Sequence, residues 1–364
     1  MKLQKLTIGA GIAALVAAAM MAPASAQAAS LASSKTVRIG YFANLTHGTA
    51  AIAHQQKLFE KYLGSGVKVQ YTYFTVGTAE IEALKGGAID IGFVGPSPAI
   101  SGYTTTHGQL LNIVSGATTG GAVFVVKPAL IAKEGSPTKA EISALAGKNL
   151  ADPGLGGTQD VALRKYLLDN GLYPGGVPKA NIVPLANADT LTQFKLGKID
   201  GAWVPEPWAT RLVQEGGAKV FLNEASLWKN GQFPTTVVVA RKQFLNQYPG
   251  SVQAVLKANL DAIKFLNDKA NRADAINQIQ DELLAGTGKK LTDAGIGAAF
   301  DNVQFSADPI ATSAVASFES AAYLKLLPTG SKVSQLKGLF NLKLLNTLLV
   351  AQGQPVISVP TEVK

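Results

Sequence analysis

Four strand-to-helix junctions of this chain carry small and hydroxylated residues: Thr46-His47-Gly48, Gly77-Thr78, Pro96-Ser97 and Gly156-Gly157-Thr158. The first turn of a helix offers unpaired backbone N–H groups and the positive end of the helix dipole, and hydroxyl groups add directed hydrogen bonds. Because the carboxyl ends of parallel strands face one cleft, these junctions should converge. They predict a site for a small anion that needs no lysine. The alternative is that the threonine and serine hydroxyls only cap their own helices.

The motifs of several enzyme classes are incomplete in this sequence. A dinucleotide fingerprint begins at Gly154, but Gln159 stands where its last glycine is required. Residues 95–99 resemble a nucleophile elbow, but Ala99 replaces the final glycine. The sequence also lacks the histidine spacing of a zinc site. We therefore predict no catalytic residue, no metal and no cofactor.

Two aspartates occupy equivalent positions of an internal repeat. The segment EIEALKGGAIDIGFVGPSPA (80–99) returns about 110 residues later as TLTQFKLGKIDGAWVPEPWA (190–209), with Asp200 under Asp90. A carboxylate pair could perform general acid–base work. Their identical positions instead favour a shared structural role at the start of a strand. A pattern used once in each half indicates two similarly built α/β lobes, with a ligand cleft between them.

The segment Pro205-Glu206-Pro207-Trp208 allows two interpretations. In the first, Trp208 forms a wall of the cleft and Glu206 meets a cationic or hydroxyl part of the ligand. In the second, Trp208 is a core aromatic residue and Glu206 pairs with Arg211 at the surface. Trp203, inside an apolar strand pattern, is assigned to the core.

Alternating strand and helix patterns predict sheets that are largely parallel and covered by helices. Two β-branched runs, at 123–126 and 235–240, bracket the second unit and are the expected crossings between the lobes, so they would form a hinge. After Gln243 the chain has a helical pattern without a strand. The apolar segment 339–350 is expected to be a packing helix. We predict the following domains: 1–28, signal peptide; 35–126 and 238–328, lobe I; 127–237, lobe II; and 329–364, a C-terminal helical extension.

Composition limits the class of protein. Apolar residues make up 47% of the chain and charged residues 16%, which is typical of a folded globular protein. Lys2 and Lys5, an apolar stretch and a small-residue cleavage site predict a secretory signal, hence a periplasmic location. The sequence has no cysteine, which excludes disulfides and thiolate chemistry. The net charge of +9 becomes 9 − 2 = +7 without the signal's two lysines, and it is scattered, which does not favour nucleic-acid binding.

Several segments together resemble the nitrate/sulfonate/taurine group of periplasmic substrate-binding proteins of ABC transporters. They are VRIGYFANLTHGTAAIA, ALKGGAIDIGFVGPSPAI, SGATTGGAVFVVK, GGTQDVALRKYL and DGAWVPEPWA. The resemblance implies a type II periplasmic-binding fold, with two α/β lobes joined by a two-strand hinge. It also implies a monomer that delivers a small anionic solute to an inner-membrane permease.

The resemblance places ligand contacts on both lobes. They are Asn44, Thr46, His47, Gly77, Thr78, Pro96, Ser97, Ser115, Thr118, Gly156, Thr158, Gln159 and Glu206, with Trp208 as a candidate from the cleft argument. An aliphatic sulfonate is the expected ligand, and nitrate, taurine or another small anion is the alternative. A two-lobe enzyme similar to the thiamine-pyrimidine synthases is disfavoured, because their cysteine-rich motif cannot exist here. A sensor-linked binding module would share the ligand site and differ only in its partner.

Overall fold

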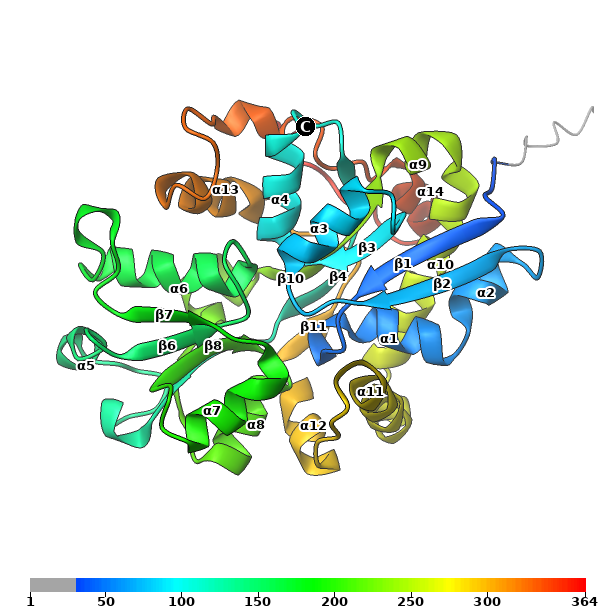
Figure 1. Ribbon diagram of the computed structural model, residues 1–364. Coiled ribbons are helices and arrows are strands. Elements are labelled where there is room, and N and C mark those ends of the chain that lie inside the picture. Colours follow the sequence, from blue (N-terminus) through cyan, green and yellow to red (C-terminus); the bar gives the residue numbers. More distant parts are fainter. Residues whose placement is uncertain (1–30) are drawn as a thin grey trace, which may run out of the picture. The chain divides into compact units, whose positions relative to one another are not determined.

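Two mixed β-sheets, each covered by helices, organise residues 31–364, which this computed structural model describes (Figure 1). The first sheet has the order β11 (Val303–Phe305), β4 (Leu111–Gly120), β10 (Pro234–Arg241), β3 (Ile91–Val94), β1 (Thr36–Tyr41) and β2 (Lys68–Tyr73). The second has the order β7 (Asn181–Pro184), β6 (Asn149–Asp152), β8 (Gly201–Pro205), β5 (Ala122–Val126) and β9 (Lys219–Asn223). The predicted α/β class is confirmed, whereas the predicted signal peptide lies outside the described residues.

The two sheets repeat one arrangement. Strand β1 is parallel to β2 and β3, and β6 is parallel to β7 and β8. In each sheet an antiparallel strand follows: β10 beside β3 in the first and β5 beside β8 in the second. The internal repeat thus corresponds to one helix–strand–helix unit in each sheet, α3-β3-α4 and α7-β8-α8.

Within residues 31–364, fourteen α-helices surround the two sheets. They are α1 (Gly48–Gln55), α2 (Leu58–Leu63), α3 (Gly77–Lys85), α4 (Pro96–Thr105), α5 (Lys139–Ser143), α6 (Thr158–Asp169), α7 (Thr190–Lys195), α8 (Trp208–Gly216), α9 (Lys242–Gln247), α10 (Pro249–Asn267), α11 (Arg272–Thr287), α12 (Asp293–Phe300), α13 (Ser313–Tyr323) and α14 (Lys343–Ala351). Lys57 has a left-handed backbone (φ 53°), which separates α1 from α2.

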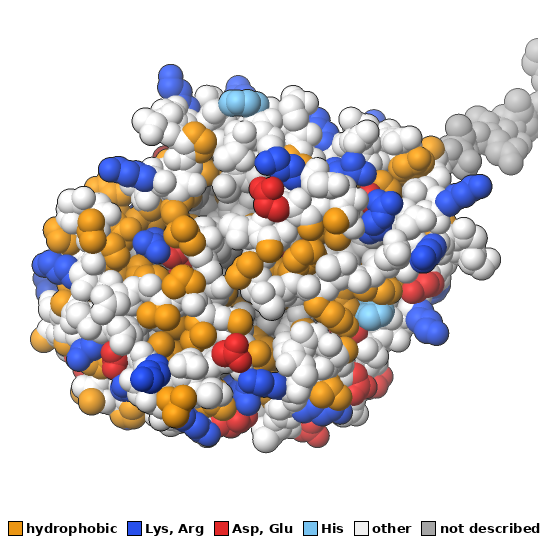
Figure 2. All heavy atoms as spheres, in the orientation of Figure 1, with side chains coloured by type: hydrophobic (Ala, Val, Ile, Leu, Met, Phe, Trp, Pro, Cys, Tyr) orange, Lys and Arg blue, Asp and Glu red, His pale blue; other side chains and the backbone are white. Residues whose placement is uncertain are grey.

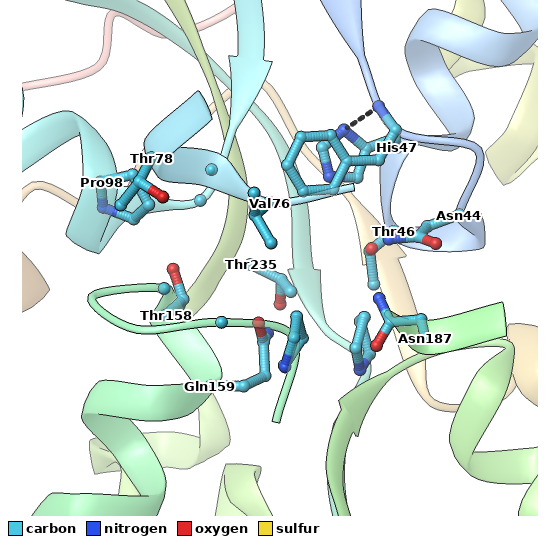
Figure 3. A pocket seen from close by; sticks show the side chains of 17 residues that line it. Asn44, Thr46, His47, Val76, Thr78, Pro98, Thr158, Gln159, Asn187 and Thr235 are labelled. Carbon is cyan, nitrogen blue, oxygen red and sulfur yellow. Dashed lines mark hydrogen bonds between the residues drawn. The ribbon is translucent and has the colours of Figure 1, made fainter. Parts of the chain in front are cut away.

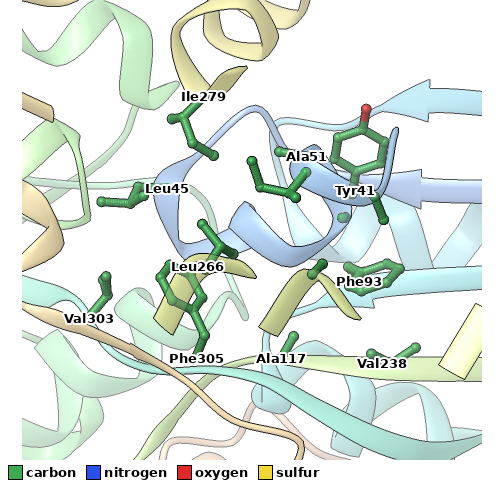
Figure 4. Packing of buried hydrophobic residues seen from close by; sticks show 14 of the residues in the cluster. Tyr41, Leu45, Ala51, Phe93, Ala117, Val238, Leu266, Ile279, Val303 and Phe305 are labelled. Carbon is green, nitrogen blue, oxygen red and sulfur yellow. The ribbon is translucent and has the colours of Figure 1, made fainter. Parts of the chain in front are cut away.

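The buried apolar side chains of the strands meet those of the helices on each sheet. In the first sheet, Phe93 of β3 and Val238 of β10 lie in the same cluster as Leu266 of α10 and Phe305 of β11 (Figure 4). In the second sheet, Trp203 is fully buried and stacks on Phe124 with ring centroids 5.3 Å apart. The assignment of Trp203 to the core is therefore confirmed.

The chain passes between the sheets at Gly120-Gly121 and again just before Pro234. Both glycines have a left-handed backbone (φ 71° and 74°), which lets the chain turn sharply between β4 and β5. The run 123–126 was expected to be a crossing, but it forms β5 within the second sheet. Likewise, the run 235–240 lies within β10 of the first sheet. The numbered lobe boundaries stay a prediction.

The expectation of no strand after Gln243 is wrong. Residues Val303–Phe305 form β11, which pairs with the end of β4. A strand of three residues is too short to show a period in the sequence. In α1, the His54 Nδ1 lies 2.9 Å from the buried Glu282 Oε1 of α11.

The C-terminal segment covers the rest of the β4 edge. The Ile113 N–H donates to Leu339 O, and the Asn341 N–H donates to Ile113 O, each at 2.9 Å. Helix α14 packs on α10 and buries Leu345, Leu348 and Leu349, so the predicted packing helix is confirmed. Over residues 31–364, no helix combines the length and hydrophobicity that a membrane crossing needs.

Candidate functional site

A small cavity lies where elements of both sheets meet. Its volume is about 30 Å³. The first sheet and its loops contribute Phe42, Asn44, Thr46, His47, Val76, Gly77, Thr78, Gly95, Pro98 and Thr235. The second contributes Pro153, Gly154, Gly157, Thr158, Gln159, Asn187 and Pro205. Figure 3 shows Thr78 and His47 on one side of the space and Thr158, Gln159 and Asn187 on the other.

Small residues let the two sides approach closely. A Cβ atom on Gly95 would lie 2.3 Å from Thr158 Oγ1, and one on Gly154 would lie 2.8 Å from Val76 Cγ1. Both distances are shorter than any van der Waals contact. The two sides therefore touch only because Gly95 and Gly154 have no side chain.

Helices α3 and α6 begin at the cavity, and α4 begins beside it at Gly95. Their N-cap residues, Val76, Gly157 and Gly95, make no side-chain cap hydrogen bond. The Thr158 Oγ1 is buried and has no partner among the described residues. For Thr158 the alternative that the hydroxyl only caps its own helix is therefore wrong. The first N–H groups of α3 and α6 are free of side-chain caps, as an anion site requires, whereas Pro96 and Pro98 leave Ser97 as the one N–H donor among the first three residues of α4.

His47 is a neutral member of the lining. The Phe42 N–H donates to its Nδ1 at 3.3 Å, and the two rings stack with centroids 4.5 Å apart (Figure 3). Burial lowers the pKa of His47 to about 3, opposed in part by the Phe93 backbone. Since Nδ1 accepts a hydrogen bond, Nε2 carries the ring proton. His47 therefore contributes a neutral imidazole and no positive charge.

The other polar side chains of the cavity are amides and hydroxyls. Asn44 Oδ1 accepts a hydrogen bond from Trp208 Nε1 at 2.6 Å, which leaves the Asn44 amide N–H groups as donors. Asn187 Oδ1 is buried and has no partner among the described residues. Among the residues that the structure describes, no lysine, arginine, aspartate or glutamate lines the cavity. On the face of the molecule in Figure 2, lysine and arginine are scattered rather than gathered.

The glycine-rich loop at 153–157 uses its own N–H groups internally. The Gly154 N–H donates to Asp152 Oδ1 at 2.7 Å, and the Gly156 N–H donates to Asp160 Oδ2 at 2.8 Å. The Gly157 N–H donates to Gly154 O at 3.0 Å. On this side, the donors left for a ligand come from the start of α6 and from Gln159.

The structure brings half of the predicted site residues to the cavity. Those that line it are Asn44, Thr46, His47, Gly77, Thr78, Thr158 and Gln159. Pro96 and Ser97 line a neighbouring groove between α6 and α13. Ser115 donates to Gly116 O at 2.7 Å, and Thr118 is buried outside the lining. Gly156 is also absent from the lining, because its N–H faces Asp160.

Glu206 and Trp208 lie behind the cavity. Both are 1% exposed. Glu206 accepts hydrogen bonds from the Thr210 N–H at 3.0 Å and from Asn302 Nδ2 at 2.6 Å, and burial raises its pKa to about 7 despite these bonds. The predicted surface ion pair between Glu206 and Arg211 is wrong, since Arg211 Nε instead lies 3.3 Å from Glu215 Oε2. Trp208 is buried and reaches the site only through Asn44.

Sequence reasoning missed several lining residues. Asn187 follows β7, a strand that the sequence pattern did not reveal. Thr235 was placed in a strand, and its hydroxyl donates to Gly120 O at the crossing between the sheets. Phe42, Val76 and Pro98 are apolar residues without a motif, so only the three-dimensional arrangement identifies them.

Asp90 and Asp200 have one structural role, as predicted. Asp90 accepts from the Arg38 N–H of β1 and from Arg241 Nη2, each at 3.1 Å. Asp200 accepts from the Asn149 N–H of β6 at 2.9 Å and from Lys127 Nζ at 2.8 Å. Asp90 therefore links the parallel strand β1 to the end of the antiparallel strand β10. Asp200 likewise links the parallel strand β6 to the residue that follows the antiparallel strand β5. Residues 31–364 contain no group of three or more potential metal ligands.

Two solved structures with the same fold are described as binding proteins. The alkanesulfonate-binding protein SsuA from Xanthomonas axonopodis pv. citri, bound to MOPS, has a TM-score of 0.65 at 21% identity, over 82% of this chain and 96% of that one. The nitrate-binding protein NrtA from Synechocystis PCC 6803 has a TM-score of 0.71 at 17% identity, over 90% and 91%. These matches confirm the predicted periplasmic-binding-protein fold.

The sequence comparisons agree with the fold. The taurine-binding periplasmic protein of Escherichia coli (strain K12) is 30% identical over 216 residues, which are 58% of this chain and 61% of that protein. The chain spans between 21% and 61% of the length of the first curated relatives it matches. The sequence profile of the NMT1-like family matches residues 31–280 of this chain. This chain therefore belongs to the NMT1-like family.

Proposed function

We propose that this protein is the periplasmic solute-binding component of an ABC importer. It captures a small organic anion between its two lobes and delivers that anion to a permease. An aliphatic sulfonate is the first candidate, and nitrate, taurine or another small anion is the second. The names of the relatives support this class, but at identities of 30% or less they do not separate these ligands.

The observation that carries the proposal is the lining of the cavity. Uncapped helix starts at Gly77 and Thr158 and the Asn44 amide offer hydrogen-bond donors, and among residues 31–364 no acid lines the space. Such fixed donors stabilise a negative charge without a counterion. Because both sheets contribute, an anion would hold the two sides together, as lobe closure requires.

Cavity size bears on the choice of anion. A cavity of about 30 Å³ suits a compact head group, such as that of a sulfonate or nitrate, better than a bulky organic body. The carbon chain of a larger anion would have to extend out of the cavity through an opened cleft. Selectivity among sulfonates should therefore depend on the chain, and affinity on the head group.

The test is a titration of the purified protein with ethanesulfonate, taurine, nitrate, sulfate and benzoate, followed by tryptophan fluorescence and by thermal shift. We expect saturable binding of one class and no turnover of the bound anion. An anion at a concentration of 100 Kd should stabilise the fold by about 2.7 kcal/mol. Silence in both measurements for every anion would contradict the proposal, and product formation would indicate an enzyme.

A further inference from the structure

Two fully buried carboxyl groups hold the glycine-rich loop from behind. Asp152 ends β6, and Asp160 lies in the first turn of α6; both are 0% exposed. Asp152 accepts the Gly154 N–H and Asp160 accepts the Gly156 N–H, at 2.7 and 2.8 Å. Since Gly154 lines the anion cavity, the position of this wall depends on the two carboxyl groups.

The charges around this pair do not balance if both carboxyl groups are ionised. Arg164 Nε donates to Asp160 Oδ1 at 2.5 Å, and Arg164 Nη1 donates to the Tyr173 hydroxyl at 3.2 Å. In the described residues, Arg164 is the one cation that forms an ion pair with either aspartate. Two carboxylates and one guanidinium would leave a net negative charge buried behind an anion site.

One oxygen indicates how the imbalance is resolved. Asp152 Oδ2 is buried and has no hydrogen-bond partner within residues 31–364. A proton between the two carboxyl groups would give this oxygen a partner and remove the excess charge. Burial and the nearby Asp160 raise the pKa of Asp152 to about 8, opposed by the Gly154 N–H and by Arg164.

We propose that Asp152 and Asp160 share one proton and act as positioning residues of the anion site. The protonated pair with Arg164 is neutral and fixes the loop. Loss of the proton places a negative charge behind the loop and weakens anion binding. This inference rests on the proposed function, because it requires an anion in the cavity.

The direction in which anion affinity changes with pH depends on which protonation state of the two aspartates binds the anion. If the protonated pair binds the anion, affinity is full below the pKa of the pair and falls as the pH rises above about 8. Ethanesulfonate and nitrate stay ionised over this range, so any change belongs to the protein. We expect their Kd to be constant between pH 6 and 7.5 and then to rise by up to ~tenfold per pH unit.

The decisive variant is Asp152→Asn, which has no charge and can still accept the Gly154 N–H. Whatever its Kd at pH 7, this variant should bind the anion with an affinity that does not change between pH 6 and ~9, because the titrating carboxyl group is gone. Glu224→Gln is the matched control. Glu224 is another buried carboxyl of the second sheet's lobe with a pKa raised by burial to about 7, but it bonds Trp203 and Trp228 and not the loop. This control should keep the slope of the unmodified protein.

A measurement without ligand separates this inference from the proposed function. The carboxyl carbon of Asp152 should titrate in carbon-13 NMR with a step near pH 8, and Asp152→Asn should remove that step. Titration of Asp152 below pH 5 would overturn the shared proton. A flat pH profile in the unmodified protein would overturn its role in binding. If the NMR step is present but no anion binds at any pH, the proposed function fails and the role in binding falls with it.

Discussion

At the scale of single residues, the site depends on contacts between neutral groups across the cleft. Asn44 lines the cavity from the first sheet's side and receives a hydrogen bond at 2.6 Å from Trp208, at the start of α8. This bond fixes which way the Asn44 amide points. Its N–H groups then face the cavity because its oxygen is occupied.

Trp208→Phe should weaken anion binding without unfolding the protein. The change removes the indole N–H and leaves Asn44 Oδ1 unpaired, so the amide is free to turn. We expect Kd to rise about five- to tenfold, which corresponds to the ~1 to 1.5 kcal/mol of one hydrogen bond. Calorimetry measures the affinity. Trp228→Phe is the control, since Trp228 bonds Glu224 at 3.2 Å away from the cavity, and an equal loss there would contradict the role of Trp208.

Gly95→Ala should block the close approach of the two sides. Gly95 has a φ of −64°, which alanine also adopts, so the effect comes from contact and not from the backbone. The new Cβ would meet Thr158 Oγ1 at 2.3 Å. We expect at least a tenfold loss of affinity, or about 1.4 kcal/mol, with an unchanged melting temperature.

The double variant Gly95→Ala with Thr158→Ala tests the cause. Without the hydroxyl, the nearest Thr158 atom is Cβ at 3.3 Å, a contact that a small shift can relieve. The added alanine should therefore cost less in the Thr158→Ala background than in the unmodified protein. An equal cost in both backgrounds would mean that Gly95 acts elsewhere.

At the scale of elements, the repeated helix–strand–helix units carry equivalent aspartates with unequal burial. Asp90 is 1% exposed and serves two arginines, whereas the Asp200 side chain is 22% exposed and serves one lysine. Removal of a buried carboxylate leaves its partners unpaired in a low dielectric. Removal of an exposed one is compensated by water.

Asp90→Ala should destabilise the protein more than Asp200→Ala. We expect a loss of about 2 to 4 kcal/mol in the free energy of unfolding for Asp90 and about 1 kcal/mol for Asp200. Urea denaturation gives both values. Anion affinity should be unchanged in each folded variant, and a selective loss of affinity would revive the acid–base interpretation.

At the scale of the whole molecule, the side chains that carry the net positive charge lie outside the cavity lining. The positive surplus is scattered, and no charged side chain from the described part of the chain lines the cavity. Fixed N–H groups inside a closed site are screened by salt much less than exposed lysines would be. Salt should therefore have little effect on binding once the lobes are closed.

We expect the Kd of the bound anion to change less than about threefold between ~20 and ~500 mM ionic strength. Sodium gluconate is the background salt, because its anion is too large for the cavity. Calorimetry at several salt concentrations provides the measurement. A steep loss of affinity with salt would indicate that lysines or arginines bind the anion instead.

The sequence alone determined the class of fold and the parts of the site that lie at helix starts. Alternation of strand and helix patterns predicted two helix-covered sheets, although it missed β11 of the first and β7 of the second, and the repeat placed Asp90 and Asp200 in one structural role. Gly77, Thr78 and Thr158, which line the cavity, could be predicted as candidates because a hydroxyl or glycine after a strand is a local signal. Such signals act within a few residues, so they survive in the sequence.

Only the tertiary structure decided what meets across the cleft. It showed that Gly156 faces Asp160, that Glu206 lies behind the cavity, and that Asn187 and Thr235 line it. In the structure, the chain crosses between the sheets at Gly120-Gly121 and not within the β-branched run 123–126. A β-branched run has the same sequence pattern in either sheet, so the pattern does not locate the crossing. The physical reason is range: contacts between residues a hundred positions apart depend on packing and burial, which no local pattern of residues records.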